Sequence, residues 1–252
     1  MQKEHARSIK RTLEVLEFFD EEHPSATVGE IARELGYPQS STSILLKSLM
    51  DLGYLSHDER TRSYRPTARV AMLGRGARPQ VFGDGALLAA LHDLNDRTGE
   101  LIFLAARVGL WVHYIYVIPA TNALRMHLRA GAIRPLVGSA TGHLFLSSMR
   151  DEDIVKAVEA TRTGAADRVV PDLAEVFAEV KRIREQGFVL SSNTVTPGGG
   201  VLAMLLPNRG NGEPLAVCVG GVGSVIERNA ERYLAEMREV MCLHMDGKTI
   251  QA

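Results

Sequence analysis

Several classes of protein are excluded by what this 252-residue chain contains little of. Its two cysteines, Cys218 and Cys242, are too few for a disulfide framework or a cysteine-based zinc cluster. No apolar run reaches the roughly 18 to 20 residues that a membrane-spanning helix needs. The first residues are polar, with an acidic side chain at Glu4, and lack the apolar core of a secretory signal. These features predict a cytoplasmic protein with no membrane association and no bound metal.

The sequence motifs of common enzymes are also missing. There is no nucleophile elbow, and no set of histidines, cysteines or carboxylates has metal-ligand spacing. Residues 198–200 are three glycines, but no Lys, Ser or Thr follows as in a phosphate-binding loop, so they are interpreted as a flexible turn. Cys218 lies in an apolar run, which is typical of a buried thiol rather than a nucleophile. An enzyme remains an alternative that none of these patterns favours, and no cofactor is predicted.

Net charge gives no argument for a nucleic-acid partner, but its distribution does. The formal net charge is −1, whereas residues 60–78 hold six arginines and no acid. A DNA-binding protein needs a basic face rather than a basic total, because neutralising phosphates supplies sequence-independent affinity. The alternative is that these arginines are an ordinary solvated surface.

Residues 27–66 have the pattern of two short helices followed by a hairpin. Ser8 is the predicted N-cap of an earlier helix, and Thr27 with Glu30 forms a capping box for the first of the two. Gly36 ends that helix, and Pro38 fits the first turn of the next one. The predicted inward side chains of this next helix are Thr42, Leu45, Leu46, Leu49 and Met50.

The outer side of that helix carries small and polar residues, which a helix needs when it enters a major groove. A hairpin over residues 53–66 follows, with basic side chains at its tip that are suited to phosphate. The pattern predicts a winged helix-turn-helix that binds double-stranded DNA. An amphipathic helix with a serine-rich exposed face is the alternative. The candidate DNA contacts are Gln39, Ser40, Ser41, Ser43, Lys47, Arg60 and Arg62.

Beyond a Gly/Pro-rich stretch, helical and strand patterns follow one another without strict alternation, which predicts an α+β domain. The expected domain boundaries are residues 1–74, a linker at 75–85, and residues 86–252. The expected helices are 86–97, 139–149, 151–160, 172–185 and 226–245. The expected strands are 101–105, 112–118, 188–190, 201–206 and 214–219, the last two joined by a hairpin turn at Asn211–Gly212.

Several segments together resemble the IclR family of bacterial transcriptional regulators. In the first domain they are residues 31–38, Ser40, Leu45, Leu46, Leu49 and residues 53–55. In the second they are residues 94–100, Gly131 with residues 134–136, residues 140–142 and residues 183–188. The resemblance implies a winged helix-turn-helix joined by a linker helix to a GAF/profilin-like effector-binding domain. It also implies homodimers or tetramers on palindromic operators, acting as repressor or activator of a catabolic operon.

Carried over by position, the family's effector pocket falls on residues of several elements. These are Ala140, Thr141, Gly142, Ser191, Val201, Cys218 and Gly220. The chain departs from the family at Gln39 and Ile44, where basic residues are common, and at residues 191–194, which replace acids by Ser-Ser-Asn-Thr. Loss of those acids favours an anionic effector.

The chemistry of the effector follows from the start of the helix at residues 139–142. Helix N-termini bind anions through unpaired backbone N–H groups, so a small carboxylate is predicted, with aromatic acids included. His127 and Tyr114 are further candidate contacts. Each of these residues also has an ordinary reading as a strand or helix residue. The alternative function is a small-molecule-binding protein with a degenerate DNA module.

Overall fold

The computed structural model describes residues 2–20, 23–73, 85–122, 128, 131–164, 170–193, 196–206 and 214–244. The chain divides into two compact units, residues 1–79 and 80–252. The predicted linker at 75–85 lies almost wholly outside the described residues, so the predicted domain boundaries stay a prediction. Each unit has its own hydrophobic core.

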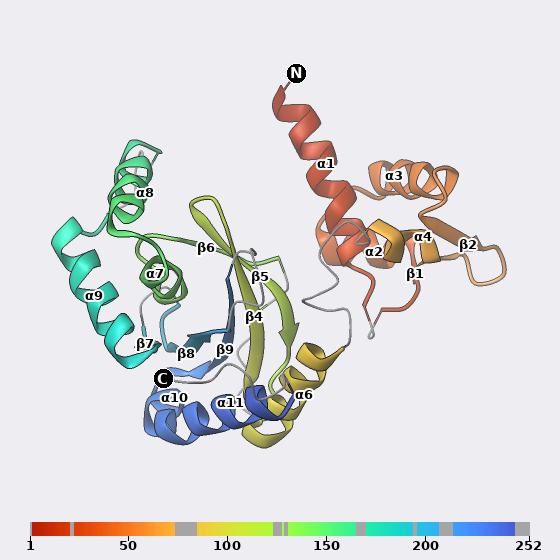
Figure 1. Cartoon of the computed structure of the whole chain (residues 1–252). Helices are drawn as coiled ribbons and strands as arrows, with labels where there is room; N and C mark the ends of the chain where they lie inside the picture. Colours follow the sequence, from red (N-terminus) through yellow and green to blue (C-terminus); the bar gives the residue numbers. More distant parts are fainter. Residues whose placement is uncertain are drawn as a thin grey trace. The chain divides into compact units, whose positions relative to one another are not determined.

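The first unit contains a three-stranded antiparallel sheet with the strand order β1-β3-β2. Its elements are α1 (Gln2–Glu17), β1 (Ala26–Thr27), α2 (Val28–Leu35), α3 (Gln39–Asp51), β2 (Leu55–Asp58), β3 (Ser63–Pro66) and α4 (Ala68–Met72) (Figure 1). The prediction that Ser8 caps the first helix is wrong, because α1 begins at Gln2. Ser8 lies inside this helix, where its carbonyl accepts a hydrogen bond from Thr12 Oγ1 at 3.0 Å.

The predicted ends of α2 are confirmed by their hydrogen bonds. Thr27 Oγ1 accepts from the Glu30 N–H at 3.3 Å, and the Thr27 N–H donates to Glu30 Oε2 at 2.7 Å. The Thr27 N–H, together with the Thr27 hydroxyl, which also donates to Glu30 Oε2 at 2.8 Å, lowers the pKa of the Glu30 carboxyl. Gly36 adopts a left-handed conformation with φ of 68°, which a residue with a side chain takes at a cost. The short turn to α3 is therefore fixed by local sequence.

A single core holds α1, α2, α3 and the hairpin together. α3 contributes Leu46 and Leu49, and its neighbour Leu45 is half-buried; Met50, predicted to point inward, is 37% exposed. The other buried members are Val15, Phe18, Ala26, Ile31, Leu55 and Tyr64. Because all these elements share one core, the outward face of α3 has a fixed orientation relative to the hairpin.

The second unit is built on a six-stranded antiparallel sheet with the order β6-β5-β4-β9-β8-β7. Its strands are β4 (Leu101–Val108), β5 (Trp111–Ile118), β6 (Ile133–Pro135), β7 (Phe188–Ser192), β8 (Gly199–Leu205) and β9 (Leu215–Val222). Its helices are α6 (Ala86–Thr98), α7 (Ala140–Ser147), α8 (Asp151–Gly164), α9 (Leu173–Gln186), α10 (Gly223–Arg228) and α11 (Ala230–His244). Strand β6 was not predicted.

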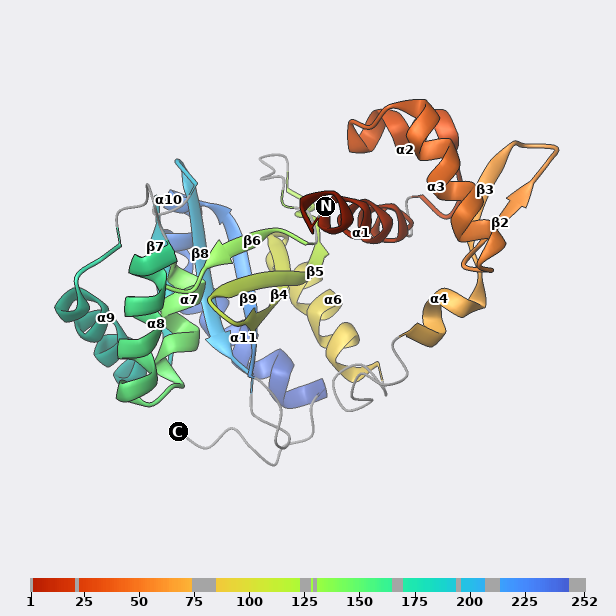
Figure 2. The same cartoon turned by 90° about the horizontal axis from the view of Figure 1, so that it is seen from above.

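Helices cover both faces of this sheet. One buried cluster joins α7, α8 and α9 to one face, and another joins α6, α10 and α11 to the opposite face. Figures 1 and 2 show the two helical layers from different directions. The α+β class is therefore confirmed. None of the helices in the described ranges has both the length and the hydropathy needed to cross a bilayer.

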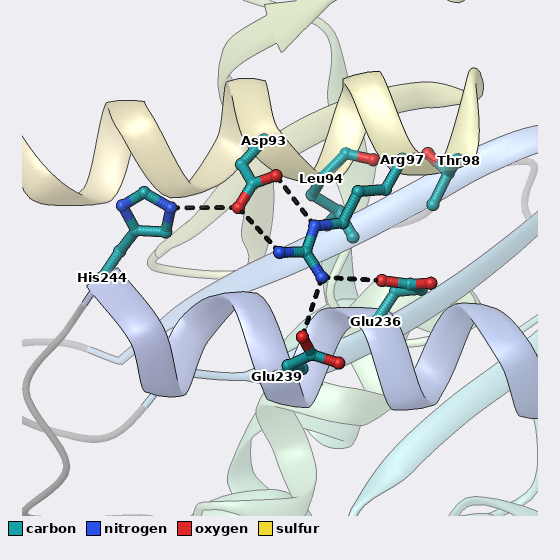
Figure 3. A network of polar contacts seen from close by, with 7 residues as sticks. All are labelled: Asp93, Leu94, Arg97, Thr98, Glu236, Glu239 and His244. Atoms are coloured by element: carbon teal, nitrogen blue, oxygen red, sulfur yellow. Dashed lines mark hydrogen bonds and ion pairs between the residues drawn. The ribbon is translucent and has the colours of Figure 1, made fainter.

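A polar network on one layer ties α6 to α11 (Figure 3). The Arg97 guanidinium donates to Asp93 Oδ1 at 2.8 Å, to Glu239 Oε1 at 3.0 Å and to Glu236 Oε2 at 3.1 Å. Asp93 Oδ2 also pairs with His244 Nε2 at 3.1 Å. The hydrogen bonds from Arg97 and His244 lower the pKa of Asp93, and those to Asp93, Glu239 and Glu236 raise that of Arg97. The network fastens α6 to α11, the first and last helices among the described residues of this unit.

Candidate functional site

The outward face of α3 is the first candidate site. Gln39, Ser40 and Lys47 are exposed there, as predicted for groove contacts. Ile44 lies between Ser40 and Lys47 at helical spacing and is 69% exposed. An isoleucine in this place can contact only an apolar group such as a thymine methyl. Its i, i+4, i+7 spacing from Ser40 and Lys47 is the signal that adds it to the candidate contacts.

Two of the predicted DNA contacts on α3 are less accessible to DNA than the others. Ser41 and Ser43 are half-buried. The Ser41 hydroxyl donates to the Pro38 carbonyl at 3.0 Å. Alternate serines of a helix cannot all face the same side, since 3.6 residues make one turn. The exposed reading face is therefore narrower than the serine-rich sequence predicts.

The hairpin of β2 and β3 can be followed in Figure 2, and the two predicted arginines fall in the turn between its strands. Arg60 and Arg62 are both exposed. Asp58 Oδ1 accepts from the N–H groups of Arg60 at 2.9 Å and Thr61 at 3.3 Å, and Arg62 has a positive φ of 52°. The bonds to Asp58 lower the pKa of its carboxyl and fix the turn. The tip is thus a preformed loop that carries two cations.

The second candidate site is a cavity of about 110 Å³ between the sheet and the start of α7. Six of the nine predicted effector contacts line it: Tyr114, Ala140, Thr141, Ser191, Val201 and Gly220. Its other described lining residues are Leu101, Phe103, Leu128, Arg134, Ser139, Thr196, Gly199, Gly200 and Gly221. His127 lies outside the described residues.

Gly142 and Cys218 do not line the cavity. A Cβ at Gly142 would lie 2.1 Å from the Leu136 carbonyl oxygen, so this glycine lets α7 pack directly on backbone. Cys218 has no exposed surface, and burial raises the pKa of its thiol well above the ordinary value. Both predicted contacts are therefore packing residues rather than lining residues of the cavity.

The start of α7 has the hydrogen-bond geometry of an anion site. The Ser139 hydroxyl donates to the Pro135 carbonyl at 2.5 Å and accepts from the Gly142 N–H at 3.1 Å. Ala140 and Thr141 occupy the first two helical positions, whose N–H groups have no partner within a helix. Both residues line the cavity, so their N–H groups are the candidate donors to a ligand there.

The cavity also contains a cation, Arg134, that sequence reasoning missed. Arg134 on β6 lies with its guanidinium carbon 5.5 Å from the centre of the Tyr114 ring. The Tyr114 hydroxyl shares a hydrogen bond of 3.3 Å with Thr141 Oγ1. Burial raises the pKa of Tyr114, so its hydroxyl stays protonated. No aspartate or glutamate occurs among the described lining residues.

The glycines at 199 and 200 also belong to the cavity, and the turn predicted for residues 198–200 is wrong for these two, whereas Gly198 does lie in a turn with a φ of 77°. Both open β8, where they pair with Val222 and Gly221. A Cβ at Gly200 would lie 2.8 Å from the Gly223 Cα, so the strand can approach α10 only without a side chain there. A glycine run of this kind serves close packing as readily as a turn, and the sequence alone does not distinguish the two.

His143, just inside α7, predicts a pH dependence of stability. Its Nε2 accepts a hydrogen bond of 3.2 Å from the Gly138 N–H, which requires that nitrogen to be unprotonated. Burial lowers the pKa of the ring below its ordinary value of about 6.5, although Glu179 acts in the opposite direction. Below pH 6.5 the unfolded chain therefore binds a proton that the folded chain resists, and stability falls as the pH decreases through this range.

The expected result is a difference between wild type and His143→Gln. The glutamine oxygen can accept the Gly138 N–H but does not titrate. Urea unfolding at pH 7.5 and at pH 5.0 should show that wild type loses more stability on acidification than the variant. An equal loss in both proteins would mean that His143 does not carry the effect. The contributions of the other histidines to the pH dependence are the same in both proteins, so they cancel in this comparison.

No group of three or more potential metal-ligating side chains occurs in the parts of the chain that are described.

A DNA-reading helix with a wing, combined with a separate α+β unit that contains a small cavity, defines a ligand-responsive helix-turn-helix regulator. Comparisons with known proteins agree with this class. The model of the IclR helix-turn-helix domain matches residues 8–59, and that of the C-terminal domain of bacterial transcriptional regulator IclR matches residues 86–241. The chain belongs to the IclR family of transcriptional regulators, which are not enzymes.

Individual relatives match almost the whole chain. The HTH-type transcriptional regulator XynR of Escherichia coli (strain K12) is 22% identical over 234 residues, 92% of each chain. The IclR regulator of Alicyclobacillus acidocaldarius has a TM-score of 0.63 at 23% identity, covering 93% of this chain and 95% of that chain. Thermotoga maritima IclR also has a TM-score of 0.63, at 20% identity, over 94% and 96%. These two structures share the fold.

Proposed function

We propose that the protein regulates a catabolic operon in the cytoplasm and senses a small organic acid, an aromatic one included. It binds a palindromic operator as a dimer or tetramer, through Gln39, Ser40, Lys47 and the wing, with Ser41 and Ser43 at the margin of the contact. The observation that carries the effector proposal is the cavity at the start of α7, which has backbone donors, a cation and no acid among its described lining residues. Such a lining favours an anion over a neutral or cationic ligand.

Regulation requires the effector to bind two states of the protein with different affinity. The cavity belongs to the second unit, and the predicted linker at 75–85 is the segment that transmits the change. The sign of the response follows from which state binds operator more tightly. Repression and activation are both compatible with this scheme.

A mobility-shift assay with the DNA upstream of the protein's own gene tests the DNA-binding half of the proposal. We expect steep weakening with salt, and competition by specific but not by random DNA. The same complex is then titrated with a panel of small acids. Absence of any retarded species at every salt concentration would favour a ligand-binding protein with a degenerate DNA module.

Thr141→Val tests the effector half. Thr141 is 1% exposed. Valine has a similar shape but lacks the hydroxyl group that can form a hydrogen bond. The binding free energy of the best acid of the panel, measured by calorimetry, should become less favourable by about 1 to 3 kcal/mol, as expected for a lost buried hydrogen bond. Tight binding by uncharged ligands alone would contradict the proposed class of effector.

A further inference from the structure

Arg134 is the single cation among the described residues that line the cavity. It lies on β6, where its backbone is opposite Val112 of β5, so the sheet fixes its position. Its Nη1 donates to the Ile133 carbonyl at 3.0 Å, and the guanidinium lies beside the Tyr114 ring. A guanidinium has five N–H donors, more than these contacts use. It can therefore bind a ligand carboxylate while keeping both contacts.

The other polar side of the cavity also favours negative charge. The backbone donors of Ala140 and Thr141 lie at the start of α7, and Thr141 Oγ1 is hydrogen-bonded to Tyr114. Tyr114 thus connects the two sides, because its ring is near Arg134 and its hydroxyl is near α7. The buried acid Glu100 does not line the cavity, and its Oε1 accepts from the Tyr233 hydroxyl at 2.9 Å.

We infer that Arg134 determines the charge specificity of the cavity by forming an ion pair with the effector's carboxylate. Thr141, Tyr114 and the start of α7 bind a second oxygen-bearing group of the same small molecule. This inference rests on the proposed function, which places a small acid in the cavity. It adds the group that distinguishes the acid from its neutral amide, because only the acid can form a charge-assisted, bidentate pair with a guanidinium.

Calorimetry on the full chain tests the assignment with lactate, succinate, benzoate and 4-hydroxybenzoate, each beside its amide. The variants are Arg134→Gln, Arg134→Lys and the control Arg182→Gln, which removes one charge from α9, away from the cavity lining. Arg134→Gln should bind the preferred acid about 10- to 100-fold more weakly and lose the preference over the amide. Arg134→Lys should retain part of the preference, since it keeps the charge but not the planar fork.

The outcomes separate this inference from the proposed function. Unchanged affinity of the acid for Arg134→Gln would overturn the assignment and leave an acid effector standing. Wild type that binds amides but none of the acids would overturn both. A weakened Arg134→Gln supports the assignment only if its thermal midpoint equals that of Arg182→Gln, and an equal loss of acid and amide binding would count against a role in charge selection.

Discussion

Gly142→Ala is expected to destabilise the second unit by about 3 kcal/mol, the upper end of the range for overpacked cores. The new Cβ would lie 2.1 Å from the Leu136 carbonyl oxygen and 2.6 Å from that of Pro135. Backbone carbonyls cannot move aside as a flexible side chain can. The first turn of α7 must therefore shift away from residues 135–136, and the Ser139 bond to the Pro135 carbonyl breaks with it.

Gly164→Ala is the matched control for this prediction. Gly164 is the last residue of α8, and among the described residues outside its own helix no atom lies within 4 Å of a Cβ there. Alanine is the better helix former by up to about 1 kcal/mol, so this change should leave stability equal or slightly higher. Only Gly142→Ala is thus expected to lower stability, although both changes introduce the same single carbon into a helix.

Trp111 provides the measurement, because it is the one tryptophan of the chain and lies on β5 of the second unit. Its fluorescence during urea unfolding reports that unit alone, which matters because two units can unfold in separate transitions. Gly142→Ala should also bind the acids of the panel more weakly, since the start of α7 forms part of the cavity. A midpoint equal to that of wild type would show that α7 does not pack on residues 135–136.

The parts of the fold that the sequence predicts are those set by local rules. Thr27, Glu30 and Gly36 specify the ends of α2 within ten residues, and the structure places a capping box and a left-handed cap there. Ser8 shows the limit of such rules, because a serine in an exposed helix interior has the same local sequence as an N-cap. Whether the helix continues upstream is decided by residues the capping rule ignores.

The parts that could not be predicted depend on contacts between distant segments. Strand β6 has three residues, too few for a periodic pattern, and exists through its pairing with β5. Arg134 therefore had no predicted place in the cavity. Gly142 was placed by resemblance to a family pocket, but its close approach to residues 135–136 appears only when the chain is folded. Neither the composition of the chain nor the spacing of its residues indicates such a close approach of two backbone segments.

The double variant Arg60→Ala, Arg62→Ala is expected to weaken operator binding strongly without changing which sequence is preferred. Charged hydrogen bonds contribute about 1.5 to 3 kcal/mol each, so the loss at low salt should be at least about 100-fold for the pair. The exposed tip that Asp58 fixes can reach phosphate, which carries no base information. All DNA sequences should therefore lose affinity by a similar factor.

The salt dependence of binding distinguishes this mechanism from general damage. The slope of log affinity against log salt should decrease by about 0.9 for each arginine–phosphate contact that is removed. Arg150→Ala with Lys181→Ala removes two exposed charges from the second unit and should leave the slope unchanged. A wing variant with weaker binding but the wild-type slope would mean that the two arginines do not contact phosphate.

Substitution on α3 should give the opposite pattern, which makes the wing result interpretable. Gln39→Ala removes an uncharged group, so the salt slope should stay at the wild-type value while discrimination among operator variants decreases. Ile44→Ala should act in the same way, at one position that prefers thymine, and deoxyuridine at that position should reproduce the loss in wild type because it lacks only the methyl group. The two surfaces then separate into a wing that supplies affinity and a helix that supplies specificity. An α3 variant that changed the salt slope as the wing variant does would contradict this division.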